Sequence, residues 1–436
     1  MRQTDKTISR RTLLAGMAAT TAVSVIGEVA AKSNVKPPDK PANVSAKALA
    51  QDESYWTEIS QQYDKTEGII NLEHGYWGKM SHPVQNYYAS ALQMVNTQNS
   101  FYVRKDYDAD LAISVQRVAE ALDVHEDEIV LTRNATEAVH SLIRQYRGLK
   151  SGDAVLFADV DYPNFRKTMA WLEQSRNVST IGLELPSRAN QQQLIDIYIQ
   201  AFDANPNLKL MLVTHVSNQH GMVLPVKQIA HEARKRGIDV ICDSAQSWGL
   251  VDYTMDDLGV DWAVFNLHKW IGAPLGVGAL YMRRGSLHKI STYPAEEDAD
   301  NIDISKRVHL GTVNFASMIT VPAALDFHQA IGGVNRQERL NYLRKLWVDE
   351  TESMPHIEML GGSDEASKTG MGSFRLRGKN TIEDAKNLQQ RIENDFGIFT
   401  VIRKDLSSGG CVRITPQVFS TPDQLSKLVN ALHKLA

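Results

Sequence analysis

Short apolar runs alternate with longer amphipathic stretches through the middle of the chain. Apolar runs of strand length lie at residues 128–132, 154–159, 209–214, 240–243, 263–266 and 278–282. The clearest helical pattern between them, residues 226–236, begins beside Pro225 and stops at Gly237. Strands with nearly continuous apolar residues are buried on both faces. The alternation therefore predicts an α/β fold built on a mostly parallel sheet.

The pattern changes after about residue 321. A long helical region, residues 321–352, leads into strand patterns at residues 373–377, 399–403 and 411–414 and helical patterns at residues 382–395 and 422–434. We therefore predict two domains. A large domain spans residues 52–320 and includes an N-terminal segment, and a small C-terminal α+β domain spans residues 321–436.

The first residues predict an export signal that is not part of the fold. Arg10 and Arg11 precede two leucines, and a moderately apolar run over residues 15–26 is followed by small residues typical of a cleavage site. This pattern resembles a twin-arginine signal over residues 1–31 and predicts a periplasmic protein. The alternatives are a disordered basic tail or an uncleaved anchor, although the apolar run is short for a membrane span. Residues 32–51 are predicted to be a linker.

Composition narrows the classes of function. The 436 residues are 43% hydrophobic and 22% charged, with a formal net charge of −4. The chain has no excess of basic residues, so its charge does not indicate a nucleic-acid partner. The two cysteines, Cys242 and Cys411, lie inside apolar runs without zinc spacing. We expect both to be small buried side chains and expect no metal site.

Polar residues close two of the predicted strands. Asp243 follows the run at residues 240–242, and His268 and Lys269 follow the run that begins at residue 263. Ligands of parallel sheets bind at the carboxyl ends of strands. A lysine beside apolar surface has a depressed pKa and is a credible nucleophile toward an aldehyde. A neighbouring carboxylate can hold a pyridine nitrogen protonated. Taken singly, such residues are more often a solvated lysine and a turn-forming aspartate.

Seven segments in order carry a resemblance to a known family. They are NLEHGYWG (residues 71–78), TRNATEA (132–138), HVSNQHG (215–221), CDSAQ (242–246), NLHKW (266–270), GTVN (311–314) and VRI (412–414). Together they resemble the class V aminotransferase family of fold-type I pyridoxal-5′-phosphate (PLP) enzymes, which includes isopenicillin N epimerases and cysteine desulfurases. The resemblance implies a seven-stranded sheet, PLP as cofactor and an amino-acid substrate. It also implies a homodimer with shared active sites, and we expect PLP to be loaded before export.

The resemblance implies a role for each candidate site residue. Lys269 is expected to form the Schiff base with PLP and to move protons at Cα, while Asp243 pairs with the ring nitrogen. Further cofactor contacts are expected from Gln246 and Asn218 near the ring oxygen, from Ala135, Thr136, Asn266 and His268 at the phosphate, from Tyr162 stacked on the ring, and from Thr312 of a second copy. Arg413 is expected to clamp the substrate carboxylate as a bidentate fork. Gly75 and Tyr76 are expected to line the substrate entrance.

Three positions depart from the usual pattern of the family. Glu73 stands where Asn is usual, and Asn266 stands where many relatives have a phosphate-binding Ser. Tyr162 stands where many relatives have a His over the ring; an aromatic side chain stacks equally well, and a phenol offers a different route for a proton. The alternative for Tyr162 is a plain loop.

The reaction stays open on the sequence alone. A desulfurase needs a cysteine on a mobile loop, whereas Cys411 lies two residues before Arg413 on the same predicted strand. The NLEHG segment and Tyr162 favour an isopenicillin N epimerase-like enzyme that works through an external aldimine and a Cα carbanion. A C–S lyase or an aminotransferase is the alternative, and a PLP-binding protein without turnover is a further one.

Overall fold

The computed structural model describes residues 37–296 and 303–435. The predicted signal, residues 1–31, and the first residues of the predicted linker lie outside this part. The end of the linker is folded, because helix α3 (Ala46–Leu49) begins at Ser45, whose hydroxyl accepts from the backbone of Ala48, and Leu49 is buried. Within the described ranges no helix combines the length and the apolar character needed to cross a membrane.

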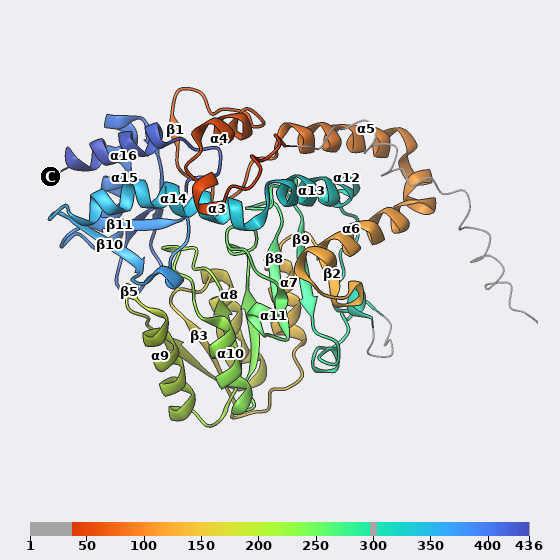
Figure 1. Cartoon of the computed structure of the whole chain (residues 1–436). Coiled ribbons are helices and arrows are strands. Elements are labelled where there is room, and N and C mark those ends of the chain that lie inside the picture. The colour runs from red at the N-terminus through yellow and green to blue at the C-terminus, as the bar shows by residue number, and fades with distance from the viewer. Residues whose placement is uncertain (1–36, 297–302, 436) are drawn as a thin grey trace, which may run out of the picture.

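A seven-stranded sheet forms the centre of the large domain, in the order β2-β9-β8-β7-β6-β3-β4 (Figure 1). Its strands are β2 (Ile129–Thr132), β3 (Ala154–Ala158), β4 (Ser179–Leu183), β6 (Leu208–Thr214), β7 (Asp239–Asp243), β8 (Trp262–Asn266) and β9 (Gly278–Met282). Within this sheet β9 runs antiparallel to both of its neighbours, and the other pairs are parallel. The predicted fold class is confirmed. The apolar runs located six of these strands and missed β4, whose residues at the sheet edge are partly exposed.

Alternate side chains of strands such as β3 and β7 enter two separate cores. Val155 of β3 and Ile241 of β7 join the cluster beneath α7 (Ala135–Gln145) and α8 (Pro163–Arg176). Leu156 and Cys242, one residue further along the same strands, join the cluster on the other face. The helices of that face are α6 (Tyr107–Leu122), α9 (Gln191–Ala204), α10 (Val226–Lys235) and α13 (Val321–Ile331). Because successive strand residues point to opposite faces, burial on both faces explains the continuous apolar runs.

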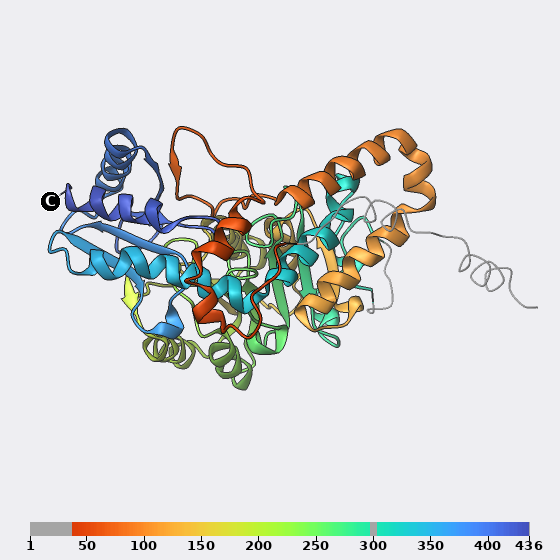
Figure 2. The same ribbon diagram turned by 45° about the horizontal axis from the view of Figure 1, so that its top comes forward.

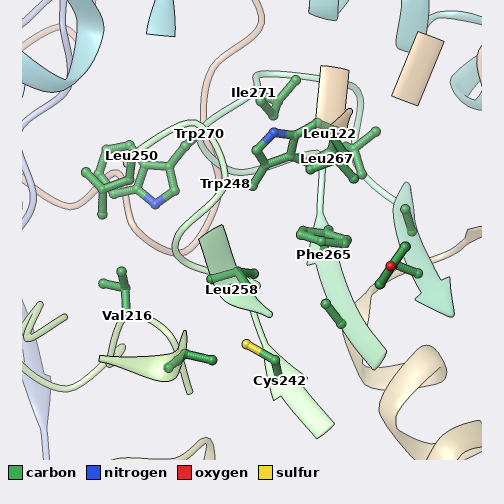
Figure 3. Close-up of a cluster of buried hydrophobic side chains, with 14 of the residues drawn as sticks. Leu122, Val216, Cys242, Trp248, Leu250, Leu258, Phe265, Leu267, Trp270 and Ile271 are labelled. Atoms are coloured by element: carbon green, nitrogen blue, oxygen red, sulfur yellow. The ribbon is translucent and has the colours of Figure 1, made fainter. Parts of the chain in front are cut away.

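The second core reaches the carboxyl end of the sheet. Figure 3 shows Cys242 and Phe265 on neighbouring strands, with Trp248 and Trp270 beyond the strand ends. The rings of Trp248 and Phe265 meet edge to face with their centroids 5.3 Å apart. This packing fixes the loop that follows β8, in which Lys269 directly precedes the fully buried Trp270.

A five-stranded sheet in the order β13-β14-β11-β10-β5 forms the centre of the small domain. Its strands are β10 (Ile357–Gly362), β11 (Gly372–Leu376), β13 (Val401–Arg403), β14 (Cys411–Ile414) and β5 (Arg188–Ala189), the last coming from the large-domain half of the chain. Its helices are α14 (Gly333–Glu352), α15 (Ile382–Phe396) and α16 (Pro422–His433). The predicted long helix is broken at Gly332, whose φ of 95° favours glycine. The first half, α13, contributes Val321, Leu325 and Phe327 to the apolar cluster on one face of the seven-stranded sheet.

The N-terminal segment contacts the small domain through a strand pairing and an ion pair before the chain continues into the large domain. Strand β1 (Ile70–Asn71) pairs in parallel with β12 (Ile398–Phe399). Helix α4 (Glu53–Ser60) carries Glu53, which forms an ion pair with the buried Arg339 of α14. The chain then continues into α5 (His82–Lys105), and α5 and α6 project from the end of the molecule opposite α15 and α16 (Figures 1 and 2). The remaining short helices are α11 (Met255–Leu258), α12 (Phe315–Ile319), η2 (Glu126–Glu128), η3 (Leu287–Lys289), η4 (Ile304–Arg307) and η5 (Glu365–Ser367).

Candidate active site

Lys269 and Asp243 lie at the carboxyl ends of adjacent parallel strands. Asp243 closes β7 opposite Val264 of β8, and Lys269 follows the end of β8 by three residues. Burial is the main reason that the pKa of Lys269 falls to about 8; Asp243 opposes this shift, and Arg413 and Arg403 add to it. Lys269 keeps part of its surface exposed, yet enough protein surrounds the amine for burial to dominate. At about pH 8, half of the amine is therefore in the neutral form that a nucleophile requires.

Asp243 has one oxygen that the chain itself does not use. Burial raises the pKa of its carboxyl, while the backbone N–H of Ala245, which donates to Oδ1 over 2.9 Å, and the charge of Lys269 lower it. Among the described residues none donates to Oδ2. A carboxylate oxygen that no donor of the chain occupies, on an otherwise buried residue, fits the protonated ring nitrogen of PLP.

Helix α7 offers an anion site at its start, close to β8. The backbone N–H of Ala135 donates to Asn266 Oδ1 over 2.9 Å, and the N–H of Glu137 donates to the side chain of Asn134 over 2.9 Å. The N–H and hydroxyl of Thr136 between them have no partner among the described residues. A helix start with a free N–H and a hydroxyl fits the phosphate of PLP. The expected backbone contact from Ala135 is instead occupied by Asn266, so Thr136 is the donor that stays free.

His268 and Gln246 both hold fixed orientations. His268 Nδ1 lies 3.0 Å from the carbonyl oxygen of Val277, and burial lowers the pKa of His268 to about 4, so the ring is neutral at pH 7. Gln246 Nε2 donates to the carbonyl oxygen of Gly75 over 2.7 Å, and its Oε1 accepts from Trp270 Nε1 over 3.0 Å. One N–H of Gln246 remains for the ring oxygen that the resemblance assigns to it.

The segment from Gly75 to Gly78 forms a wall against the lysine loop. The N–H of Gly78 donates to the carbonyl oxygen of His268 over 2.9 Å, and a Cβ on Gly78 would overlap the carbonyl oxygen of Lys269. A Cβ on Gly75 would lie 2.6 Å from Nη2 of Arg413. Position 78 therefore requires glycine because backbone atoms approach it closely, whereas a side chain at Gly75 would displace the end of the Arg413 side chain. Tyr76 between them is 77% exposed, and its role at the substrate entrance stays a prediction.

Arg413 is fully buried, and its fork is engaged by the chain. Nη2 donates to both carboxylate oxygens of Glu73 over 2.7 and 2.8 Å, and Nη1 donates to the carbonyl oxygen of Asn218 over 2.6 Å. Burial alone would raise the pKa of Glu73, but Arg413 and Arg403 hold it below its usual value. The expected bidentate clamp on a substrate carboxylate is thus shared with Glu73, the residue that replaces the usual Asn.

Arg403 is a site residue that the sequence did not single out. Strand pairing places Arg403 opposite Cys411, so Arg403 and Arg413 project from the same face of the β13–β14 pair. Arg403 Nη2 lies 3.8 Å from Glu73 Oε1, and burial is the main reason that the pKa of Arg403 falls to about 10. The sequence does show an arginine at the end of a short predicted strand. Only the register of β13 against β14 shows that this arginine lies beside Arg413.

The loop that carries Tyr162 is anchored at the strand ends. Asp161 is fully buried and accepts from the backbone N–H of Ala158 and of Thr214, each over 2.8 Å. Burial raises the pKa of Asp161 to about 8, and Asp243 adds to the rise. The Tyr162 ring packs edge to face against Phe165, with the centroids 5.0 Å apart. Its stacking on the cofactor stays a prediction.

Asn218 and Thr312, two further residues expected at the site, lie in different surroundings. Asn218 lies beside Arg413 and accepts from Gln219 Nε2 on its Oδ1 over 3.3 Å. Thr312 is exposed, and no described residue forms a hydrogen bond with its hydroxyl. Its neighbour Asn314 donates to the Tyr88 hydroxyl of α5 over 2.8 Å. The predicted contact of Thr312 with a second copy stays a prediction.

Neither cysteine is available for chemistry. Cys242 and Cys411 are buried free thiols, as expected from their apolar surroundings. Burial raises the pKa of Cys242 to about 12 and that of Cys411 to about 11. No cluster of metal-ligating side chains occurs in the described part of the chain.

Comparison with known proteins identifies the family. The family model "Aminotransferase class-V" matches residues 80–428. The chain belongs to the aminotransferase class-V family. Its members depend on PLP, and the donor set at Lys269, Asp243 and Thr136 fits that cofactor, so the chain is a PLP-dependent enzyme.

Individual relatives are distant but cover most of the chain. An isopenicillin N epimerase of Amycolatopsis lactamdurans is 23% identical over 402 residues, covering 87% of this chain and 98% of its own. A cysteine desulfurase of Haloferax volcanii is 25% identical over 334 residues, covering 72% and 76%. The solved complex of the cystine C–S lyase C-DES with cysteine persulfide shares the fold, with a TM-score of 0.72 at 18% identity over 84% of this chain and 97% of the other.

The depressed pKa of Lys269 predicts how PLP uptake depends on pH. Below about pH 8 the amine carries a proton and cannot attack an aldehyde, so the rate of PLP uptake by the cofactor-free chain should rise through pH 8 and then level off. Asp243→Asn removes the charge that favours the ammonium form and should move the midpoint to lower pH. Absorbance after rapid mixing with PLP measures the rate. Glu358→Gln, which removes the carboxylate paired with Arg375, is the control and should keep the midpoint. A midpoint near 10.5, the ordinary lysine value, would contradict the assignment.

The close approach of Gly78 to Lys269 predicts the effect of one methyl group. Gly78→Ala should cost about 2 kcal/mol by overpacking and weaken PLP binding by roughly 10- to 30-fold. Urea unfolding and PLP titration measure the two effects. Gly182→Ala is the matched control, since its nearest neighbour, Phe157 Cε2, lies at an ordinary 3.7 Å. If the two variants have the same stability and the same affinity for PLP, residue 78 does not closely contact the loop of Lys269.

Proposed function

We propose that this enzyme removes the α-proton of an amino acid and returns it to the opposite face, an isopenicillin N epimerase-like reaction. One observation carries the proposal: a buried amine with a pKa of about 8, at Lys269, shares its surroundings with Asp243 and with two arginines that suit a carboxylate. These groups are what proton transfer at Cα requires. The 98% coverage of the Amycolatopsis epimerase supports the same choice. The name describes similarity, and the substrate need not be a penicillin.

Each residue has a defined task in this reaction. PLP, when bound, supplies an electron sink for the charge left at Cα. Lys269 accepts and donates the proton at Cα on its own face. Asp243 holds the proton on the ring nitrogen, Thr136 binds the phosphate, and Arg413 orients the substrate carboxylate. For inversion the opposite face needs a second group, and the Tyr162 phenol on its anchored loop is our candidate.

A C–S lyase is the second candidate, because elimination of a β-sulfur group needs the same residues and no enzyme thiol. Desulfuration through an enzyme persulfide is disfavoured, since it requires a thiolate at an accessible position. Cys411 lies within β14 with a pKa near 11, and Cys242 lies within β7 with a pKa near 12.

Replacement of Lys269 tests the proposal directly. Lys269→Ala should lower turnover by at least about a thousandfold, because the proton-transfer group is lost together with the point of cofactor attachment. The reaction of the native enzyme with a panel of L-amino acids should incorporate deuterium at Cα and yield the D-form, as measured by NMR and chiral chromatography. Borohydride treatment should attach PLP mass to the Lys269 peptide. Pyruvate with released thiol would indicate the C–S lyase instead, and undiminished turnover of the variant would refute both.

We also propose that the enzyme is exported through its twin-arginine signal. The Arg10-Arg11 pair and the apolar run behind it support this destination, and folded export agrees with loading of PLP in the cytoplasm. Changing Arg10 and Arg11 together to Lys should retain the protein in the cytoplasm, whereas Arg2→Lys should not. Cell fractionation and the N-terminal mass of the periplasmic form provide the measurement. A native protein that stays cytoplasmic at full length would contradict export.

A further inference from the structure

Glu73 is held in place by four groups of the chain. Its carboxylate accepts from Arg413 Nη2 on both oxygens and from Thr415 Oγ1 on Oε2 over 3.1 Å, while its backbone N–H donates to Asn71 Oδ1 over 2.8 Å. Arg403 lies beside it at 3.8 Å, beyond hydrogen-bond distance. Glu73 is therefore a fixed carboxylate beside Arg413, the residue to which the family resemblance assigns the carboxylate of the substrate.

The cluster of Arg403, Arg413 and Glu73 contains two positive charges and one negative charge, so one positive charge has no counter-charge within it. Two guanidinium groups face a single carboxylate, and Nε of each arginine is buried without a hydrogen-bond partner in the described part of the chain. Asp405 has a smaller effect on Arg403 than Glu73 has, and its Oδ2 accepts from Gln219 Nε2 over 3.5 Å. Lys269 interacts most strongly with Asp243 and more weakly with Arg413, Arg403 and Glu73. One further carboxylate would complete the cluster, and a second would have no cationic partner.

We propose that Glu73 makes the site selective for amino acids with a single carboxylate and excludes short dicarboxylic amino acids such as aspartate and glutamate. The inference rests on the proposed function for the presence of an amino acid at this site. The α-carboxylate binds to the arginine pair, Arg403 and Arg413. A second carboxylate on a short side chain stays within reach of Glu73 and meets a like charge in a buried setting, which opposes binding.

Carboxylates without an amino group test the selectivity without any reaction. Propionate and succinate are titrated by calorimetry into the full chain loaded with PLP. The native protein should bind propionate at least about tenfold more tightly than succinate. Glu73→Gln keeps the size of the side chain but leaves two arginines without a counter-charge, so succinate should bind at least about tenfold more tightly than to the native protein. Glu358→Gln, which breaks a bidentate Arg–Glu pair elsewhere in the small domain, should leave both affinities unchanged.

A double variant separates charge from shape. Glu73→Gln with Arg403→Gln restores a single positive charge and should restore the preference for propionate. A double variant that behaves like Glu73→Gln, or a Glu73→Gln variant with native selectivity, overturns the proposal. If Glu73→Gln does not fold, the Arg403→Gln variant is the test. It leaves Arg413 and Glu73 as a neutral pair, so propionate should bind at least about tenfold more weakly than to the native protein. Unchanged binding of propionate overturns the proposal.

Failure of this proposal is distinguishable from failure of the proposed function. A chain that attaches PLP at Lys269 and inverts an amino acid, yet binds both acids equally, loses only the selectivity. A chain that takes up no PLP refutes the proposed function, while titrations of the cofactor-free chain with the same two acids still measure whether the arginine pair selects a single carboxylate.

Discussion

The buried ion pair between Glu73 and Arg413 joins segments that are 340 positions apart and brings both domains to Lys269. Removing one member of such a pair leaves an uncompensated buried charge, which typically costs 3–5 kcal/mol. The pair also sets the path of the chain that follows it. The carbonyl oxygen of Gly75 accepts from Gln246, the N–H of Gly78 donates to His268, and a Cβ on Gly78 would overlap the backbone of Lys269. The segment from Gly75 to Gly78 is thus positioned by this ion pair together with the pairing of β1 with β12 and the bridge between Glu73 and Thr415.

Burial supplies the electrostatic conditions for catalysis. The apolar cluster with Trp248 and Trp270 holds the loop of Lys269 against the sheet, and the loss of water around the amine lowers its pKa (Figure 3). Asp243 lies on the adjacent strand, where it limits that shift and keeps an oxygen for the ring nitrogen. The same lack of water strengthens every charge contact nearby. A cluster with one uncompensated positive charge therefore binds one carboxylate strongly and disfavours the binding of a second.

Within one fold the family carries out several reactions, so chemistry must be assigned from particular side chains. Here both thiols are buried in strands, which disfavours a persulfide on the enzyme. Glu73 and Tyr162 are the departures from the usual pattern. One changes what the carboxylate site accepts, and the other places a phenol on a loop that Asp161 anchors to two strands.

The sequence by itself determined the parallel sheet, the positions of Lys269 and Asp243 at strand ends, and the family. These features depend on local apolar periodicity and on motifs that are contiguous in the chain. It missed β4 and the break at Gly332, because an edge strand is only partly buried and a single glycine does not reveal its φ. The sequence also showed Glu73 as unusual without indicating its partner. Only the tertiary structure decided that Glu73 meets Arg413 and Arg403, because strand register and domain packing, which bring distant residues into contact, are not encoded in any local pattern.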